Sequence, residues 1–278
     1  MRYQRVETEP GLLQALEAPG TRILCGGTDL LVKLRAGLFR AECLVDIVSL
    51  ASLHGIRETE DALVVGAATP ETDLLESAVV RTRFPVLTQA IAQLGSTQIR
   101  NRGTLGGNLV NASPAADSAV PLLVYGAELK LVSAAQERVV ALSDFLTGPS
   151  QTLLEPGEYV RCIHIPYDPA LNWTHYHKVG KRNALTIAIA SVGMAGTLQD
   201  GVFKEMRIAA GSVAPTAKRL PAVEALIVGM PLAGLPIEKI HAAAMDSIAP
   251  ISDVRATADY RRRVVADLIV RALGDVPA

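Results

Sequence analysis

Two glycine-rich segments constrain this chain more strongly than any other feature of its sequence. The first glycine segment, residues 23–31, reads ILCGGTDLL, and the second glycine segment, residues 99–117, reads IRNRGTLGGNLVNASPAAD. Because glycine lacks a Cβ atom, backbone amides in such segments can approach phosphate oxygens closely. One segment alone would be weak evidence, but two of them in this order predict two walls around a single pyrophosphate.

The length and composition of the chain predict a sizeable core and argue against one class of partner. Its 278 residues are enough for one large domain or for a few small ones. The chain is 49% hydrophobic but only 4% aromatic, so its core is expected to consist mainly of small aliphatic side chains. With 27 basic and 28 acidic residues, it lacks the basic excess that is typical of a nucleic-acid-binding protein.

The N-terminal residues and the cysteines predict a cytoplasmic protein without a metal site of its own. Charged residues follow Met1 closely, so we expect no signal peptide. The longest uncharged run, residues 183–199, is too short and too polar for a membrane span. Cys25, Cys43 and Cys162 lie far apart, which supports neither a disulfide framework nor a cysteine-ligated cluster. A reducing cytoplasm suits such free cysteines.

Hydrophobic patterning predicts two lobes in the first part of the chain, about residues 1–60 and 61–172. The first lobe opens with a βαβ unit, in which Thr28 caps the helix and Gly37 ends it. Its strands are expected at 22–25 and 44–48, with a third strand at 63–66. In the second lobe, Pro114 suits the first position of a helix. The elements expected there are helices at 85–95 and 114–125, a helix start at 143–145, and strands at 129–132, 138–141 and 160–166.

The pattern changes near Asn172, where we place a domain boundary. Three stretches typical of strands, joined by turns, come first, and three helical segments follow them. A run of strands followed by a run of helices is typical of an α+β unit, so residues 173–278 are predicted to form a C-terminal α+β domain. The strands are expected at 173–179, 187–198 and 203–210, and the helices at 220–228, 237–245 and 258–273.

Each glycine segment also has a purely structural interpretation. The sequence from Gly26 to Asp29 is consistent with a tight strand-to-helix turn, and it does not match the GxGxxG pattern of a Rossmann fold. Asp29 is expected to cap the helix or to accept a hydrogen bond from a hydroxyl group. The stretch 103–108 is consistent with a glycine-rich loop between helices. An anion site is compatible with the first interpretation, because amides at a helix start carry partial positive charge.

Polar side chains favour a cofactor at the second glycine segment. Hydroxyl, amide and carboxylate groups gather within a few residues there, and a ribityl chain or a ribose needs such partners. They belong to Thr104, Asn108, Asn111, Ser113 and Asp117. For Asp117 the alternative is a place in the first turn of the helix expected after Pro114.

Together with three further motifs, the two glycine segments resemble a known family. The further motifs are YHKVGKR at 176–182, GSVAPT at 211–216 and YRRR at 260–263. Over nearly its whole length the chain is similar to the FAD-binding medium subunit of the molybdenum hydroxylases, which include xanthine dehydrogenase, carbon monoxide dehydrogenase and hydroxybenzoyl-CoA reductase. The resemblance implies an α+β protein with a two-lobed FAD-binding domain of the vanillyl-alcohol oxidase (PCMH) type, followed by a C-terminal α+β domain.

The resemblance also implies roles for individual residues. The backbone from Leu24 to Leu30 would wrap the pyrophosphate, and the second glycine segment would form the other wall. Leu94 and Gly95 would flank the flavin and adenine region, and Asn111 with Asp117 would bind sugar oxygens. Val160 and Lys178 would approach the cofactor, although a solvated strand lysine is the alternative for Lys178. The full set of expected FAD-binding residues is Leu24, Cys25, Gly26, Gly27, Thr28, Asp29, Leu30, Leu94, Gly95, Gly103, Thr104, Gly107, Asn108, Asn111, Asp117, Val160 and Lys178.

Some features depart from the family or carry weaker signals. Carbon monoxide dehydrogenase subunits usually have His-Ser where this chain has Thr28-Asp29, which separates the chain from that subgroup. The additional cysteine-ligated 4Fe–4S cluster of hydroxybenzoyl-CoA reductase is not expected, because three scattered cysteines cannot hold one. His175 and His177 share one strand face, but no acidic or cysteine ligand lies near them in sequence, so a metal site is not favoured.

The resulting hypothesis is a FAD-carrying electron-transfer subunit of a molybdenum hydroxylase. The resemblance implies a large partner with the molybdenum cofactor and a small partner with 2Fe–2S clusters, in a hetero-oligomer compatible with a dimer of heterotrimers. Electrons would reach FAD from the clusters and leave to an external acceptor. No catalytic residue is expected in this chain, because the flavin does the redox chemistry. The alternatives are a stand-alone FAD-dependent reductase or oxidase and a non-catalytic FAD-loaded scaffold protein.

Overall fold

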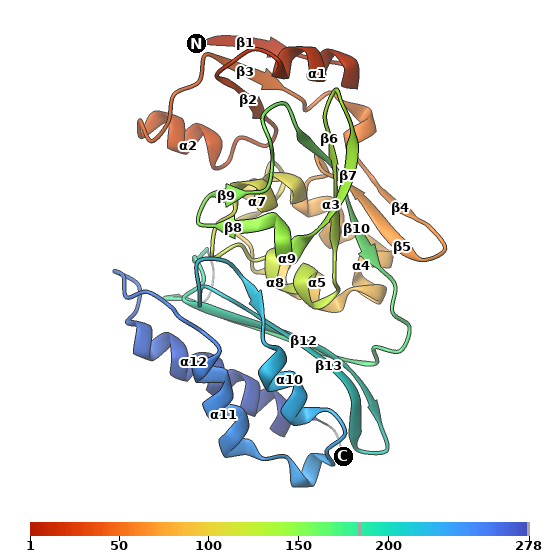
Figure 1. The fold of residues 1–278 in the computed structure, drawn as a ribbon, viewed down its shortest axis with the longest axis vertical. Helices are drawn as coiled ribbons and strands as arrows, with labels where there is room; N and C mark the ends of the chain where they lie inside the picture. Colours follow the sequence, from red (N-terminus) through yellow and green to blue (C-terminus); the bar gives the residue numbers. More distant parts are fainter. Residues whose placement is uncertain (183–184, 277–278) are drawn as a thin grey trace.

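Three sheets of three or more strands, with their associated helices, follow one another along the length of the described part of the molecule in the computed structural model (Figure 1). The structure describes residues 1–182 and 185–276. Residues 183–184 and 277–278, which fall within the predicted C-terminal domain, lie outside the described residues. Among the described residues, no helix is both long enough and apolar enough to cross a membrane.

The first sheet has three parallel strands in the order β1-β3-β2. The predicted βαβ unit is its β2-α2-β3 part. A strand and a helix precede this unit, and we predicted neither of them. The strand was missed because every residue of β1 is exposed and its sequence RYQR carries no apolar pattern. The elements are β1 (Arg2–Arg5), α1 (Glu9–Leu16), β2 (Thr21–Leu24), α2 (Leu30–Arg35) and β3 (Cys43–Asp46).

The second sheet has five antiparallel strands in the order β4-β5-β10-β6-β7. The strand expected at 63–66 as part of the opening unit belongs here instead, because it pairs with β10 from Leu63 to Gly66. All residues of β5 are buried, so both of its faces are covered. The strands are β4 (Ile56–Glu58), β5 (Ala62–Gly66), β6 (Glu128–Val132), β7 (Glu137–Ala141) and β10 (Tyr159–Pro166), with a separate hairpin of β8 (Leu146–Gly148) and β9 (Gln151–Thr152).

Short helices accompany this second sheet, and one of them begins later than predicted. The helix expected from Pro114 starts at Ala119, because the carbonyl of Pro114 accepts a hydrogen bond from the amide of Ser212 (2.8 Å). That carbonyl is therefore not used within a helix. The helices are η1 (Ala51–Leu53), α3 (Glu71–Glu76), α4 (Ala78–Arg83), α5 (Pro85–Ala92), α6 (Thr97–Arg100), α7 (Leu105–Asn111), α8 (Ala119–Val124) and α9 (Leu142–Phe145).

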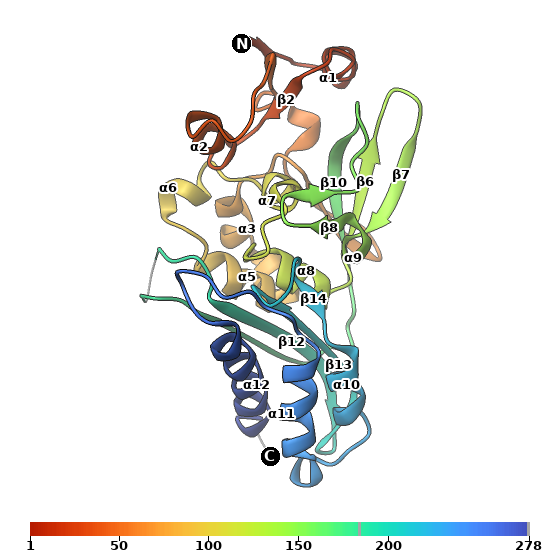
Figure 2. The same ribbon diagram turned by 60° about the vertical axis from the view of Figure 1, so that its left-hand side comes forward.

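The C-terminal sheet is antiparallel, in the order β11-β12-β13-β14, and lies between two groups of helices (Figure 2). Helices α5 and α8 contact it from one side, and α10, α11 and α12 cover its other face. All three strands and all three helices expected here are present, with shifted ends. They are β11 (Trp173–Val179), β12 (Ala190–Gln199), β13 (Val202–Gly211), β14 (Lys218–Arg219), α10 (Pro221–Ile227), η2 (Leu232–Gly234), α11 (Ile237–Asp246) and α12 (Ala258–Gly274).

Small residues allow α8 to pack closely against the C-terminal sheet. A Cβ atom on Gly193 would lie 3.0 Å from Val120 Cγ1, and one on Gly211 would lie 2.8 Å from Val120 Cγ2. Side chains larger than glycine would therefore push α8 away from β12 and β13. This packing fixes the end of the second glycine segment, which leads directly into α8.

Candidate functional site

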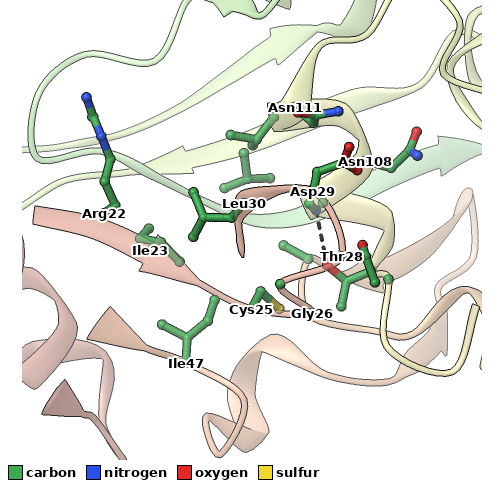
Figure 3. A pocket seen from close by; sticks show the side chains of 18 of the residues that line it. Arg22, Ile23, Cys25, Gly26, Thr28, Asp29, Leu30, Ile47, Asn108 and Asn111 are labelled. Atoms are coloured by element: carbon green, nitrogen blue, oxygen red, sulfur yellow. Dashed lines mark hydrogen bonds between the residues drawn. The ribbon is translucent and has the colours of Figure 1, made fainter. Parts of the chain in front are cut away.

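Both glycine segments line one cavity of about 410 Å³ (Figure 3). The first segment lines it with the turn between β2 and α2, and the second with the residues that begin α7. Residues 103–108 are thus not the loop that we considered as an alternative, because Leu105–Asn111 is helical. Sequence positions that are far apart therefore form opposite sides of one cavity.

Gly26 and Gly27 shape the first side of this cavity by packing and by turning the chain. A Cβ atom on Gly26 would lie 1.9 Å from the carbonyl oxygen of Arg102, so only glycine lets the two segments touch through their backbones. Gly27 has a φ of +74°, which favours glycine. Thr28 is not the helix cap that we predicted. Asp29 occupies that position, but its helical φ and ψ of −104° and −46° leave its side chain without a capping hydrogen bond.

The second side of the cavity begins at Thr104, whose hydroxyl accepts a hydrogen bond from the amide of Gly107 (3.1 Å) and caps α7. Gly106 packs against the protein, since its Cβ atom would lie 2.6 Å from the carbonyl oxygen of Ala67. Gly107 differs from it. A Cβ atom there would meet only Thr104 Oγ1 within 4 Å among the described residues outside its own helix. The missing side chain of Gly107 therefore leaves room on the cavity side.

The structure brings most of the residues expected at the site to this cavity and places the others nearby. Gly95 and Lys178 line a second cavity of about 490 Å³. Leu24 lies beneath the turn, because a Cβ atom on Gly27 would be 3.2 Å from its Cδ1 atom. Those that line the first cavity are Cys25, Gly26, Gly27, Thr28, Asp29, Leu30, Leu94, Gly103, Thr104, Gly107, Asn108, Asn111 and Val160.

Asp117 and Lys178 form a buried ion pair. Their Oδ2 and Nζ atoms are 2.6 Å apart, and Nζ also donates to the carbonyl of Gln93 (2.9 Å). The Lys178 side chain is only 2% exposed, so the alternative of a solvated lysine is wrong. Asp117 precedes α8 and so does not lie in the first turn of a helix. Burial raises the pKa of Asp117 to about 6, although Lys178 opposes the rise.

Lys33 is a charged residue at the cavity that the sequence did not reveal. It lies on α2, and its Nζ atom donates to Asn111 Oδ1 (2.5 Å) and to Ser150 Oγ (3.3 Å). These contacts link the first lobe to the second. The sequence offered one signal for Lys33: it lies four residues after Asp29, so the two side chains lie on one side of the helix. Lys33 supplies a positive charge where an anionic ligand needs one.

Glu71 is the second functional candidate that the sequence did not reveal. It lines the cavity from α3 and is only 1% exposed, and neither of its carboxylate oxygens has a hydrogen-bond partner among the described residues. Burial raises its pKa to about 8, and the nearby carboxylate of Asp117 adds to the rise. Burial therefore favours the uncharged form of Glu71 in the cavity wall.

The histidines and cysteines form no metal site in the part of the chain that the structure describes. No group of three or more His, Cys, Asp or Glu side chains lies close enough together there to hold a metal ion. The rings of His175 and His177 stack with their centroids 6.4 Å apart on β11. Cys25, Cys43 and Cys162 are all free thiols.

Comparison with known proteins identifies the class to which this fold and cavity belong. Residues 1–168 match the family model of the FAD-binding domain in molybdopterin dehydrogenase, and residues 175–276 match that of the carbon monoxide dehydrogenase flavoprotein C-terminal domain. The chain is thus a dehydrogenase flavoprotein with an FAD-binding domain and a C-terminal domain. It belongs to the family of FAD-binding medium subunits of the xanthine and carbon monoxide dehydrogenase type. The resemblance and the fold class predicted from the sequence are confirmed.

Individual relatives match almost the whole chain. The xanthine dehydrogenase FAD-binding subunit of Escherichia coli O157:H7 is 33% identical, over 99% of this chain and 96% of its own length. The glyceraldehyde dehydrogenase medium chain of Sulfolobus acidocaldarius is also 33% identical, over 99% and 97%. Among solved structures, carbon monoxide dehydrogenase from Hydrogenophaga pseudoflava superposes with a TM-score of 0.94 at 30% identity, covering 99% of this chain and 96% of that one.

Proposed function

We propose that this chain is the FAD-carrying electron-transfer subunit of a molybdenum hydroxylase complex. It receives electrons from 2Fe–2S clusters of a partner and passes them to an external acceptor. The observation that carries the proposal is that the two glycine segments form opposite sides of one cavity in a chain of the FAD-binding family. The cavity wall suits an anionic dinucleotide, because it combines glycine backbone, the positive charge of Lys33 and polar side chains from α7.

We further propose which residues hold the cofactor. Backbone amides of residues 24–30 face the diphosphate, and Lys33 supplies positive charge. Residues 103–108 form the opposite wall, where most of their amides donate to acceptors within the protein. Asn111 and Asp117 bind sugar oxygens, and Asp117 has one carboxylate oxygen, Oδ1, without a hydrogen-bond partner among the described residues. FAD supplies the redox chemistry when bound, and the chain binds it, orients it and excludes water. The boundaries proposed for this arrangement are a FAD-binding domain of residues 1–172, with lobes of about 1–60 and 61–172, and a C-terminal domain of residues 173–278.

The partners are part of the same proposal. The relatives are described as medium chains or FAD-binding subunits of dehydrogenases, which supports a complex with further chains. We propose a large subunit with the molybdenum cofactor and a small subunit with 2Fe–2S clusters, assembled in the cytoplasm as a dimer of heterotrimers. Size measurement and mass spectrometry of the co-purified chains test this stoichiometry. Purification as a lone active enzyme would favour the stand-alone reductase, and a lone inactive flavoprotein would favour the scaffold.

The purified chain is expected to be yellow and to hold one non-covalent FAD. Burial raises the pKa of the Cys25 thiol, which therefore stays protonated and unsuited to covalent attachment of the flavin. Acid precipitation should release all of the flavin, and mass spectrometry of the supernatant should identify it as FAD. Flavin that remains in the pellet, or FMN in place of FAD, would contradict the proposal.

A further inference from the structure

Glu71 has two features that a purely structural residue seldom combines. Its side chain is almost fully buried, and both of its carboxylate oxygens lack hydrogen-bond partners among the described residues. Leaving such a group unpaired destabilises a protein, and buried polar side chains are almost always paired. Glu71 also lines the cavity between the two glycine segments. A bound ligand that pairs with the carboxyl group would account for both features.

The backbone holds Glu71 at the cavity. Its amide donates to the carbonyl of Gly103 (2.9 Å), and the preceding Pro70 forms a bridge with Thr104. Leu74, one turn further along α3, is completely buried. The start of α3 is therefore fastened to the second glycine segment, which prevents Glu71 from swinging out to solvent.

The neighbouring charged groups do not compensate a negative charge on Glu71. Asp117 is the acidic neighbour, and Lys178 is engaged by Asp117 Oδ2 and by the carbonyl of Gln93. Lys33, a basic residue of α2 that lines the cavity, is engaged by Asn111 and Ser150. Within residues 1–182 and 185–276, no basic group lies within salt-bridge distance of Glu71. A neutral carboxyl group, by contrast, needs no counter-ion and offers one O–H donor.

We propose that Glu71 is a further FAD-binding residue, and that its carboxyl group donates a hydrogen bond to an acceptor atom of the bound cofactor. This inference rests on the proposal that FAD occupies the cavity. It adds a carboxyl hydrogen-bond donor to a wall that also contains glycine backbone, Lys33 and amide side chains. A carboxylate would repel the anionic cofactor, whereas a carboxylic acid can donate a hydrogen bond to an acceptor atom of the cofactor.

Variants at position 71 separate a ligand-binding role from a structural one. Glu71→Leu removes the donor, so the affinity for FAD should fall about tenfold or more, while the flavin-free chain should melt at a higher temperature. Glu71→Gln keeps an uncharged donor and should bind FAD within about threefold of the wild-type affinity. Glu76→Leu, at the exposed end of the same helix, is the matched control and should leave FAD affinity unchanged. Titration of the flavin-free chain with FAD, followed by flavin fluorescence, measures these affinities.

A structural role predicts a different result. If the carboxyl group is satisfied within the protein, for example by a buried water, Glu71→Leu will bind FAD as tightly as wild type and melt at a lower temperature, which would overturn the inference. If wild type itself fails to bind FAD, the proposed function is wrong, and the two failures are thus distinguishable.

Infrared difference spectroscopy gives a second readout if Glu71→Leu does not fold. In the wild-type chain, FAD binding should shift the C=O band of a protonated carboxyl group, and this shift should be absent from Glu71→Gln. The same shift in Glu71→Gln, or no carboxyl band that responds to FAD in wild type, would also contradict the inference.

Discussion

Replacing Gly107 with valine is expected to abolish FAD binding while leaving the fold in place. Among the described residues outside its own helix, the Cβ atom would meet only the capping hydroxyl of Thr104, at 2.8 Å, so the rest of the side chain is expected to enter the cavity. Weakening that cap costs about 1 kcal/mol, which is small compared with the free energy of unfolding of a typical folded protein. Flavin content, measured by absorbance, should fall to zero, whereas the far-ultraviolet circular dichroism spectrum should stay as in wild type.

Gly274→Val is the matched control for this change. Gly274 ends α12, and a Cβ atom there would meet nothing within 4 Å in the part of the chain that the structure describes. This variant should therefore keep a full complement of flavin. A normal flavin content in Gly107→Val would remove Gly107 from the site, and loss of the circular dichroism signal would show that the residue supports the fold instead.

The flavin-free chain is expected to become less stable as the pH rises from about 5 to 8. The pKa of Glu71 is raised from 4.5 to about 8 in the folded protein, so in this range the folded state holds a proton that the unfolded state has released. Stability falls with pH wherever the folded state binds more protons, by up to about 1.4 kcal/mol per pH unit for one proton. Asp117, with its pKa raised to about 6, should add to the fall at the acidic end of the range.

Urea unfolding at several pH values measures this dependence. In Glu71→Gln the contribution of Glu71 should vanish, so the free energy of unfolding should fall much less between pH 6 and pH 8. Glu76→Gln should keep the wild-type slope, because Glu76 is exposed on the same helix. Equal slopes in wild type and Glu71→Gln would show that Glu71 is ionised in the folded protein at neutral pH.

Local patterns were sufficient to predict the strands and helices of the C-terminal sheet. β12 is a long apolar strand, β13 ends in an apolar stretch after Arg207, and α12 carries a clear helical pattern that begins at the Thr257 cap. The two glycine segments predicted a shared cavity because the absence of side chains is visible in the sequence itself. Identifying the family then depended on the motifs around these glycines.

The features that the sequence did not predict depend on tertiary contacts. The contact between Lys33 and Asn111 joins residues that are 78 positions apart, so no local sequence pattern predicts it. Glu71 resembles any acidic residue in the first turn of a helix, and only the packing of α3 against the second glycine segment buries it. The late start of α8 likewise depends on a hydrogen bond from Ser212, which lies in another domain of the chain.

Anaerobic reduction of the flavin tests the central claim, that this chain relays electrons instead of oxidising a substrate itself. The measurement follows the visible absorption of FAD after substrate of the complex is added, with and without the partner chains. In the complete complex the flavin should bleach, because electrons reach it through the partner's clusters. In the isolated, FAD-loaded chain the same substrate should leave the absorption unchanged. Bleaching in the isolated chain would contradict the account and would establish a stand-alone oxidoreductase.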